Sequence, residues 1–242
     1  MPSVSGLSGS VGGRRLAACR CVHRTTFARQ AANLWWVVKE RIWQQLVHRV
    51  RHEPDVALVD SIPLPVCQVA RAHRCRRFRG EAAYGKDTLV RQTFYGFRVH
   101  VRLCWPGVID RVVLAPANVS ELAAVPALAE GTTGLLLGDR NDHAPRLMEE
   151  LAGQGVRLLA PFRWASRDPD PTRAPLLSRF RYRIDTAFGQ LVDRYRAKRV
   201  WARDAWHLGS RLLRKVLSHT LAVHFTARDS HPPLHHADLI LA

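Results

Sequence analysis

The chain has 242 residues, of which 47% are hydrophobic and 24% charged, a balance typical of one good-sized globular domain with an appendage. No apolar run approaches the ~20 residues that a membrane span requires, so we expect no membrane partner. The basic residues are mostly arginine and give a net charge of +17, which indicates a polyanion, most simply a nucleic acid. Five cysteines, an odd number, argue against a disulfide framework and fit a reducing cytoplasm.

The first part of the chain divides into a leader and a helical segment. Residues 1–24 are rich in Gly and Ser and then in Arg, which predicts a disordered leader. Over residues 25–54 apolar side chains recur at helical spacing, which predicts one long amphipathic helix or two short ones. Because its apolar face is broad, we expect this helix to pack on a partner element.

The stretch 56–63 organises the rest of the chain. Four apolar residues run directly into Asp60, which predicts a strand buried on both faces. We expect Pro63 and Pro65 to stop any sheet pairing after it. A carboxylate on such a rigid strand is well placed to hold a metal ion, because burying a lone charge is costly. The alternative is a strand-end Asp that caps a turn.

Basic side chains dominate the segment 67–90, which we expect to be an excursion from the sheet. Its arginines are either phosphate contacts or a solvated surface, and the net charge favours phosphate contact. The predicted DNA-contacting residues here are Arg71, Arg74, Arg76, Arg77 and Arg79.

The remaining segments predict a mixed sheet with helical crossovers. Alternating patterns predict strands over 94–105 and 108–116, joined as a hairpin at Pro106. The segments that follow are a helix over 120–130, a strand over 135–139, a helix over 144–153, a strand over 156–161, and helices over 177–195 and 207–225. This order predicts an α/β fold, a mixed five-stranded sheet flanked by helices. Trp201 and Trp206 lie between the last two helices. Each could pack in the core or stack on DNA, and we prefer core packing.

Two acids follow buried strands, and a helix offers a third. Asp60 and Asp139 leave the sheet at the carboxyl ends of strands, where open α/β sheets carry their active sites. Asp185 lies one residue beyond the core position Ile184, at the border of the buried helix face. Arg181 is one turn earlier and could steady a carboxylate or a phosphate. Three such carboxylates suit Mg²⁺ or Mn²⁺, and two ions about 4 Å apart can cut a phosphodiester.

Four blocks of the chain resemble the DDE transposases of bacterial insertion sequences. They are residues 59–67, 94–100, 138–141 and 181–191, and the resemblance extends roughly over residues 25–225. It implies a ribonuclease-H-like catalytic core with Asp60, Asp139 and Asp185 as the metal-binding acids. The family usually has Glu at the third place, and Ser178 and Val192 stand where some relatives have Tyr and Lys.

The resemblance implies a DNA transposase that cuts the ends of its own mobile element and joins them to target DNA. Its partners would be two Mg²⁺ or Mn²⁺ ions, double-stranded DNA (terminal repeats and target) and further copies of the chain, in a bacterial cytoplasm near the nucleoid. Arg181 is added to the predicted DNA contacts. The expected domains are the leader 1–24, a remnant DNA-binding helical segment 25–54, the catalytic domain 55–226 and a flexible tail 227–242.

Two other functions stay open. One is an inactive or truncated remnant that only binds DNA, because the third acid is an Asp and only about one helix precedes the core. The other is a ribonuclease-H-like nuclease of the host, which would cut without preference for element ends.

Overall fold

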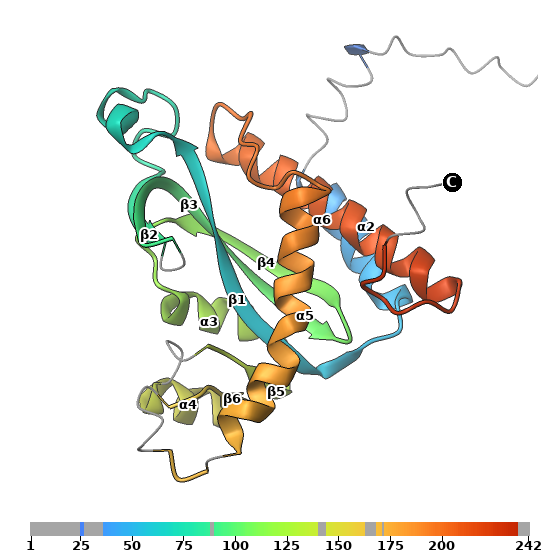
Figure 1. Cartoon of the computed structure of the whole chain (residues 1–242). Coiled ribbons are helices and arrows are strands. Elements are labelled where there is room, and N and C mark those ends of the chain that lie inside the picture. The colour runs from blue at the N-terminus through green and yellow to red at the C-terminus, as the bar shows by residue number, and fades with distance from the viewer. Residues whose placement is uncertain are drawn as a thin grey trace, which may run out of the picture. The chain divides into compact units, whose positions relative to one another are not determined.

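The computed structural model describes residues 25–26, 36–87, 90–139, 144–162, 168–170 and 172–236 (Figure 1). The chain forms two compact units, Met1–Asn33 and Leu34–Ala242. In the first unit only Thr25 and Thr26 are described, and both are helical. The expected leader, most of the chain before α2 and residues 140–141 of the third family-like block lie outside the described residues. The second unit, Leu34–Ala242, contains all the described strands.

The described residues form a six-stranded mixed sheet in the order β2-β3-β1-β5-β6, with β4 also paired to β3. The strands are β1 (Glu53–Cys67), β2 (Ala83–Asp87), β3 (Gln92–Trp105), β4 (Val108–Pro116), β5 (Gly134–Leu137) and β6 (Val156–Leu159). Pairing is antiparallel among β1 to β4 and parallel from β1 to β5 and β6. The predicted α/β class with a mixed sheet is confirmed. The sixth strand is β2, a short strand with alternate exposed residues inside the segment expected to be a basic excursion.

The expectation that the two prolines stop the sheet pairing is wrong. β1 continues past Pro63 and Pro65, and both stay paired with β3. After Leu58, which pairs with Leu137, β1 has no further partner on its β5 side among the described residues. Residues two apart in a strand direct their backbone nitrogens to the same side, so one unpaired edge accommodates both proline rings. Asp60 therefore lies inside β1, just past the point where the parallel pairing ends.

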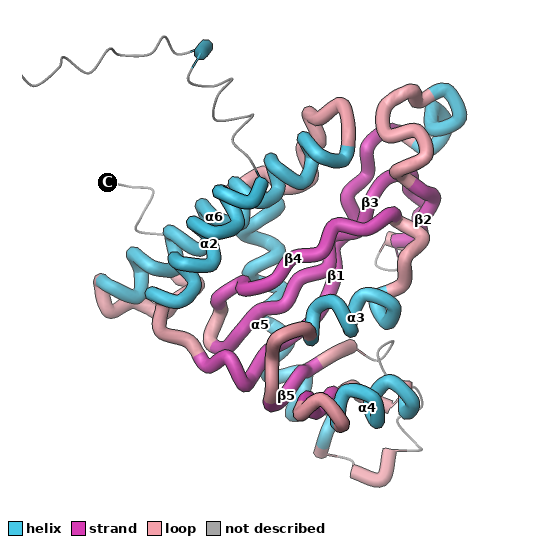
Figure 2. Tube along the Cα trace, turned by 180° about the vertical axis from the view of Figure 1, so that it is seen from behind, coloured by secondary structure: helices cyan, strands magenta, loops and turns pink. Residues whose placement is uncertain are grey.

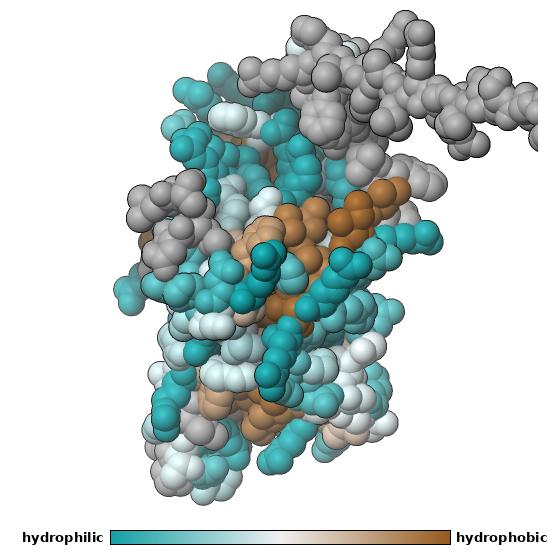
Figure 3. Space-filling view, turned by 90° about the vertical axis from the view of Figure 1, so that its right-hand side faces the viewer, coloured by the Kyte–Doolittle hydropathy of each residue, from teal (hydrophilic) through white to brown (hydrophobic). Residues whose placement is uncertain are grey.

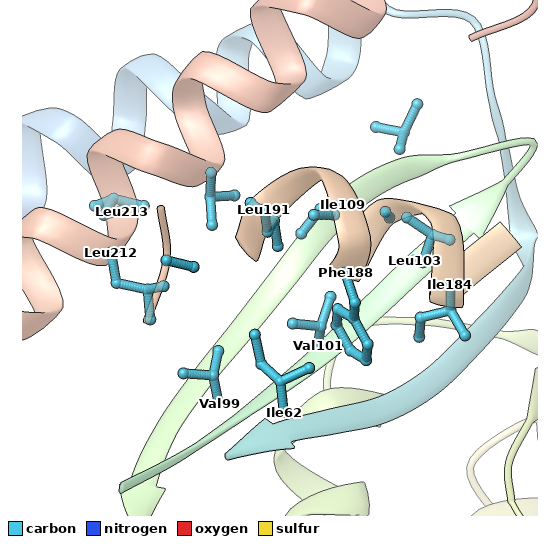
Figure 4. Close-up of a cluster of buried hydrophobic side chains, with 14 of the residues drawn as sticks. Ile62, Val99, Val101, Leu103, Ile109, Ile184, Phe188, Leu191, Leu212 and Leu213 are labelled. Carbon is cyan, nitrogen blue, oxygen red and sulfur yellow. The ribbon is translucent and has the colours of Figure 1, made fainter. Parts of the chain in front are cut away.

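Helices cover both faces of the sheet (Figures 1 and 2). They are α2 (Trp36–Arg49), the 3₁₀ helix η1 (Val69–Arg74), α3 (Glu121–Ala129), α4 (Pro145–Ala152), α5 (Arg173–Asp193) and α6 (Ala205–Arg228). α5 crosses one face, and Figure 4 shows its Phe188 beside Val101 and its Ile184 near Leu103 of β3. α3 and α4 cover the other face with a second apolar cluster. The prediction that the strand before Asp60 is buried on both faces is thus confirmed.

α2 and α6 pack side by side, as Figures 1 and 2 both show. Trp43 of α2 is buried, and its indole Nε1 donates a hydrogen bond to Thr220 Oγ1 at 3.1 Å. The partner element expected for the N-terminal helix is therefore α6. Figure 3 looks onto the side where these helices lie and shows apolar side chains among hydrophilic ones; Ile42 of α2 and Phe225 of α6 are exposed.

The last helices begin earlier than predicted, and part of the tail is packed. α5 starts at Arg173 and α6 at Ala205, where Asp204 caps the helix by accepting a hydrogen bond from His207 N at 2.8 Å. The tail was expected to be loose from residue 227, but it is packed as far as His236. Gln190 of α5 donates from Nε2 to the carbonyl oxygen of Leu234 at 2.6 Å. Among the described helices, none combines the length and apolarity needed to cross a membrane.

Candidate active site

Asp60 and Asp139 meet at one edge of the sheet because their strands run parallel. Leu58 of β1 is opposite Leu137 of β5, and each acid follows two residues later. One arginine of α5 joins them. Arg181 Nη2 lies 3.2 Å from Asp60 Oδ2, and its Nη1 lies 2.5 Å from Asp139 Oδ1. Two of the three predicted acids are thus brought together, with the predicted arginine between them.

The arginine reaches the acids because α5 crosses the sheet at their edge. Leu177, Arg181 and Ile184 lie on one face of the helix at spacings of four and three residues. All three line a cavity of about 410 Å³, together with both acids. The apolar residues fix α5 on the sheet, while the arginine is 42% exposed at the cavity mouth. The site is therefore open to a charged ligand.

Asp185, the third predicted acid, is placed differently. It is exposed on α5 and is not among the residues that line the cavity. Its charge still acts on the site. Burial lowers the pKa of Arg181, but its hydrogen bond to Asp139 and the charges of Asp60, Asp139 and Asp185 outweigh burial and raise that pKa. In the part of the chain that is described, no three His, Cys, Asp or Glu side chains are close enough to hold a metal ion.

The electrostatics of Asp60 show that this carboxylate lacks positive charge. The pKa of Asp60 is raised to about 7, chiefly by burial and also by the charges of Glu121 and Asp139. The opposing effects of Arg181 and of the Ser61 backbone N–H, 2.7 Å from Asp60 Oδ1, do not compensate. A divalent cation would supply the missing charge, and carboxylate oxygens are the donors that Mg²⁺ and Mn²⁺ prefer. Asp60 and Asp139 therefore fit a metal ion of this kind.

A polar network on the opposite face of β1 supports Asp60, and sequence reasoning missed it. Ser61 Oγ donates to Glu121 Oε1 at 2.6 Å, and Arg98 Nη1 donates to both residues, at 3.1 and 3.2 Å. Arg98 Nη2 also donates to the Lys86 carbonyl at 2.7 Å. The sequence identified residues 120–121 as a helix start but gave no sign of this contact. The network holds Ser61, whose backbone N–H in turn orients the Asp60 carboxylate.

His100 lies on this same face, opposite Ser61 in the register of β1 and β3. It is 1% exposed, and burial, followed by the charge of Arg98, lowers its pKa to about 4. Its Nε2 has no hydrogen-bond partner among the described residues and faces a cavity of about 10 Å³ lined by Glu121 and Val125. A space of that size holds about one water molecule. Its position between the sheet and α3 is that of a structural histidine.

The five arginines predicted to contact DNA lie on and after η1. All five are exposed: Arg71, Arg74, Arg76, Arg77 and Arg79. None forms an ion pair with a carboxylate of the described residues. Phe78 anchors the segment by packing edge-on against Phe97, with ring centroids 5.3 Å apart. The segment is therefore fixed to the sheet while its charges face solvent. Arg181 does not belong to this group, because it lies between the two acids.

Comparison with known proteins gives one match. A family model described as "Transposase DDE domain" matches residues 51–199, more than half of the chain. The matched range contains the three predicted acids and the basic segment around η1. No curated protein and no solved structure matches the chain.

Proposed function

The chain belongs to the transposase DDE domain family, and from this premise we propose that it cuts DNA at the ends of its own mobile element and transfers the cut strand into target DNA. One observation carries the proposal. Asp60 and Asp139, from parallel strands, meet at a cavity with Arg181 between them. Paired carboxylates at this edge are the arrangement that metal-assisted phosphodiester chemistry requires.

Each side chain of the site has a distinct part in the proposed chemistry. When bound, Mg²⁺ or Mn²⁺ ions supply a more nucleophilic oxygen and a stabilised leaving oxygen. Asp60 and Asp139 are the residues that would hold them, and Asp185 is the proposed third ligand on the next turn of α5. Arg181 now forms ion pairs with both carboxylates. Because Arg181 is 42% exposed, it could also bind a phosphate oxygen of the DNA once the two carboxylates hold a metal ion.

The proposed DNA partner is bound by the exposed arginines around η1. Phosphate contacts of this kind give affinity that falls steeply with salt. Two element ends must be joined in one reaction, so we propose that further copies of the chain assemble on the DNA.

The test is strand cleavage of a labelled duplex that carries the inverted repeat flanking the gene. We expect nicks at the repeat end with Mg²⁺ or Mn²⁺, and none after chelation or in Asp60→Asn or Asp139→Asn. A matched control is Asp193→Asn, an exposed acid at the end of α5. Nicking that survives both site substitutions would mean that this site is not the catalytic centre.

A DNA-binding remnant without catalysis is the second candidate function. The observation that favours it is the exposure of Asp185, outside the cavity and one carbon shorter than the Glu of its family. This candidate predicts that the wild-type chain binds the terminal repeat but never nicks it. A gain of cleavage in Asp185→Glu would then identify the native Asp as the defect.

A further inference from the structure

The connection between α5 and α6, residues 194–204, carries an unexplained tryptophan. Trp201 is 69% exposed and Trp206 is 40% exposed, so the sequence-based preference for core packing is wrong for both residues. Five exposed cations lie in the same connection: Arg194, Arg196, Lys198, Arg199 and Arg203. Covering the Trp201 ring with a ligand would remove a large apolar area from water, which is favourable. We call residues 194–204 the Trp201 loop.

The Trp201 loop is anchored rather than loose. Ala197 and Ala202 are buried, 4% and 5% exposed, and join the main apolar cluster. The backbone N–H of Ala197 donates to the Leu191 carbonyl at 2.7 Å. Lys215 of α6 donates from Nζ to the carbonyl of Arg196 at 2.5 Å. The backbone is therefore fixed on α5 and α6; between the two alanines Val200 packs against the cluster, while Lys198, Arg199 and Trp201 are exposed.

The positive charges of this loop are available to a ligand. Arg196, Lys198 and Arg199 form no ion pair with a carboxylate in the described part of the chain. The guanidinium of Arg199 lies 5.7 Å from the centroid of the Trp201 ring, a cation–π contact that orients the indole. A single aromatic platform beside several free cations matches the chemistry of a nucleic-acid strand, in which each base is flanked by phosphates.

The loop is continuous with the predicted DNA surface. Ala205, the first residue after it, donates its backbone N–H to Glu81 Oε2 at 3.3 Å. Glu81 closely follows the arginines of the η1 segment, and Figure 1 shows that segment and the start of α6 beyond the same end of β1. The two basic segments therefore adjoin, although more than a hundred residues separate them in the chain.

We propose that the Trp201 loop is a binding site for unpaired DNA: Trp201 stacks on an unpaired base while Arg196, Lys198 and Arg199 bind the neighbouring phosphates. The bases of an intact duplex present only their edges in the grooves, so a flat indole needs a base that has left the stack. This inference rests on the proposed function, which supplies DNA as the partner. The inference adds that the chain binds DNA more tightly when the strands are unpaired near the cut.

The experiment compares two DNAs in equilibrium binding with the full chain. One is a fully paired terminal repeat, and the other carries a short unpaired stretch beside its end. We expect Trp201→Ala to weaken binding of the second DNA roughly 10- to 100-fold, the effect of losing one stacked base, and to leave the first unchanged. Trp201→Phe should restore most of the loss, because a smaller ring still stacks. The matched control is Phe225→Ala, an exposed aromatic (43%) about 30 Å further along α6.

The inference is overturned if Trp201→Ala binds both DNAs as the wild type does, or if it loses both to the same extent. In the first case the indole faces another class of partner, and in the second it contacts the duplex. Cleavage assays separate these results from failure of the function itself. A wild-type chain that nicks the repeat while Trp201→Ala keeps full affinity contradicts only this inference, whereas a wild type that neither binds nor nicks contradicts both.

Discussion

Asp60 is held from both faces of the sheet. On the α5 side its carboxylate meets Arg181, and on the α3 side the network of Ser61, Glu121 and Arg98 fixes the neighbouring backbone. A carboxylate that must bind a metal needs such support, because its geometry has to be kept within about 0.5 Å. Asp60 and Ser61 reach the two faces from one strand because adjacent residues of a strand point to opposite faces.

Glu121 is the residue through which this support can be tested. In Glu121→Ala the Ser61 hydroxyl and the Arg98 guanidinium lose their shared acceptor, and we expect a loss of about 1–3 kcal/mol in the free energy of unfolding. Glu121→Gln keeps an oxygen acceptor at the same place and should lose less. Urea unfolding measures both. Equal losses in the two variants would show that charge, rather than the hydrogen bonds, is what matters at this position.

A buried ion pair lies within the β3–β4 hairpin, and its arginine also donates a hydrogen bond to α3. Arg102 is 5% exposed, and its Nη2 lies 2.5 Å from Asp110 Oδ2, while its Nη1 donates to the Leu128 carbonyl at 2.6 Å. Burial lowers the pKa of Arg102, but the hydrogen bond and the charge of Asp110 raise it overall, so the guanidinium stays charged. The hairpin and the helix are therefore coupled through one fully paired cation.

Breaking that pair should be costly, because the remaining charge would stay buried. We expect Asp110→Asn to lower the free energy of unfolding by about 3–5 kcal/mol. The double variant Arg102→Met/Asp110→Leu removes both charges and should recover most of the loss. Chemical denaturation of the wild type and the two variants measures these free energies of unfolding. A loss below about 1 kcal/mol in Asp110→Asn would contradict a buried, stabilising ion pair.

The junction of α5, α6 and the tail contains two buried histidines. His219 of α6 contacts Gln190 Oε1 at 3.0 Å and lies edge-on to Tyr195 and His236. Burial, followed by the charge of His236, lowers the pKa of His219 to about 3. Burial likewise lowers the pKa of His236 to about 4, and Arg194 and His235 act in the same direction. Both rings are neutral in the folded chain at ordinary pH.

Acid should therefore loosen this junction. The unfolded chain binds protons near the ordinary histidine pKa of about 6.5, and the folded chain does not until far lower pH, so stability falls as pH drops below about 6.5. Each histidine should remove about 2 kcal/mol between about pH 7 and pH 5. The measurement is the free energy of unfolding against pH in wild type and His219→Gln. If the free energy of unfolding falls equally with pH in both proteins, His219 is not a source of the acid sensitivity.

At the scale of the whole molecule, part of the positive charge that gives the chain its net +17 gathers on two described segments. The exposed arginines around η1 and the Trp201 loop adjoin at one end of the sheet. Because phosphate contacts release counterions, the number of such contacts is read from the slope of log affinity against log salt.

This location predicts how the salt dependence changes. Arg76→Gln/Arg77→Gln should reduce the slope by about 2, one unit for each lost phosphate contact. Arg49→Gln/Arg228→Gln removes the same charge from exposed positions on α2 and α6 and should leave the slope unchanged. Equal changes in both pairs would mean that the whole surface, and not the η1 segment, binds DNA.

The sequence was sufficient to predict the features that follow from the alternation and length of apolar runs in the strands. The apolar runs before Asp60 and Asp139 predicted two parallel strands, and their shared register brings the acids together. Other features depend on tertiary geometry. Glu121 reaches Ser61 from sixty residues away through particular rotamers, which no periodicity encodes. Because Asp185 follows the buried Ile184, the sequence left undecided whether its side chain points into the site or to solvent. The two prolines of β1 are tolerated only because one edge of this strand is unpaired in the described part of the chain.

The most direct test of the central claim is a crystal structure of the chain with Mn²⁺, located by its anomalous scattering. The account predicts a Mn²⁺ peak that contacts one oxygen of Asp60 and one of Asp139, with Arg181 displaced from at least one of them. The same experiment on Asp60→Asn should show no peak. A wild-type crystal in which Arg181 keeps both carboxylates, and Mn²⁺ binds elsewhere or not at all, would contradict it.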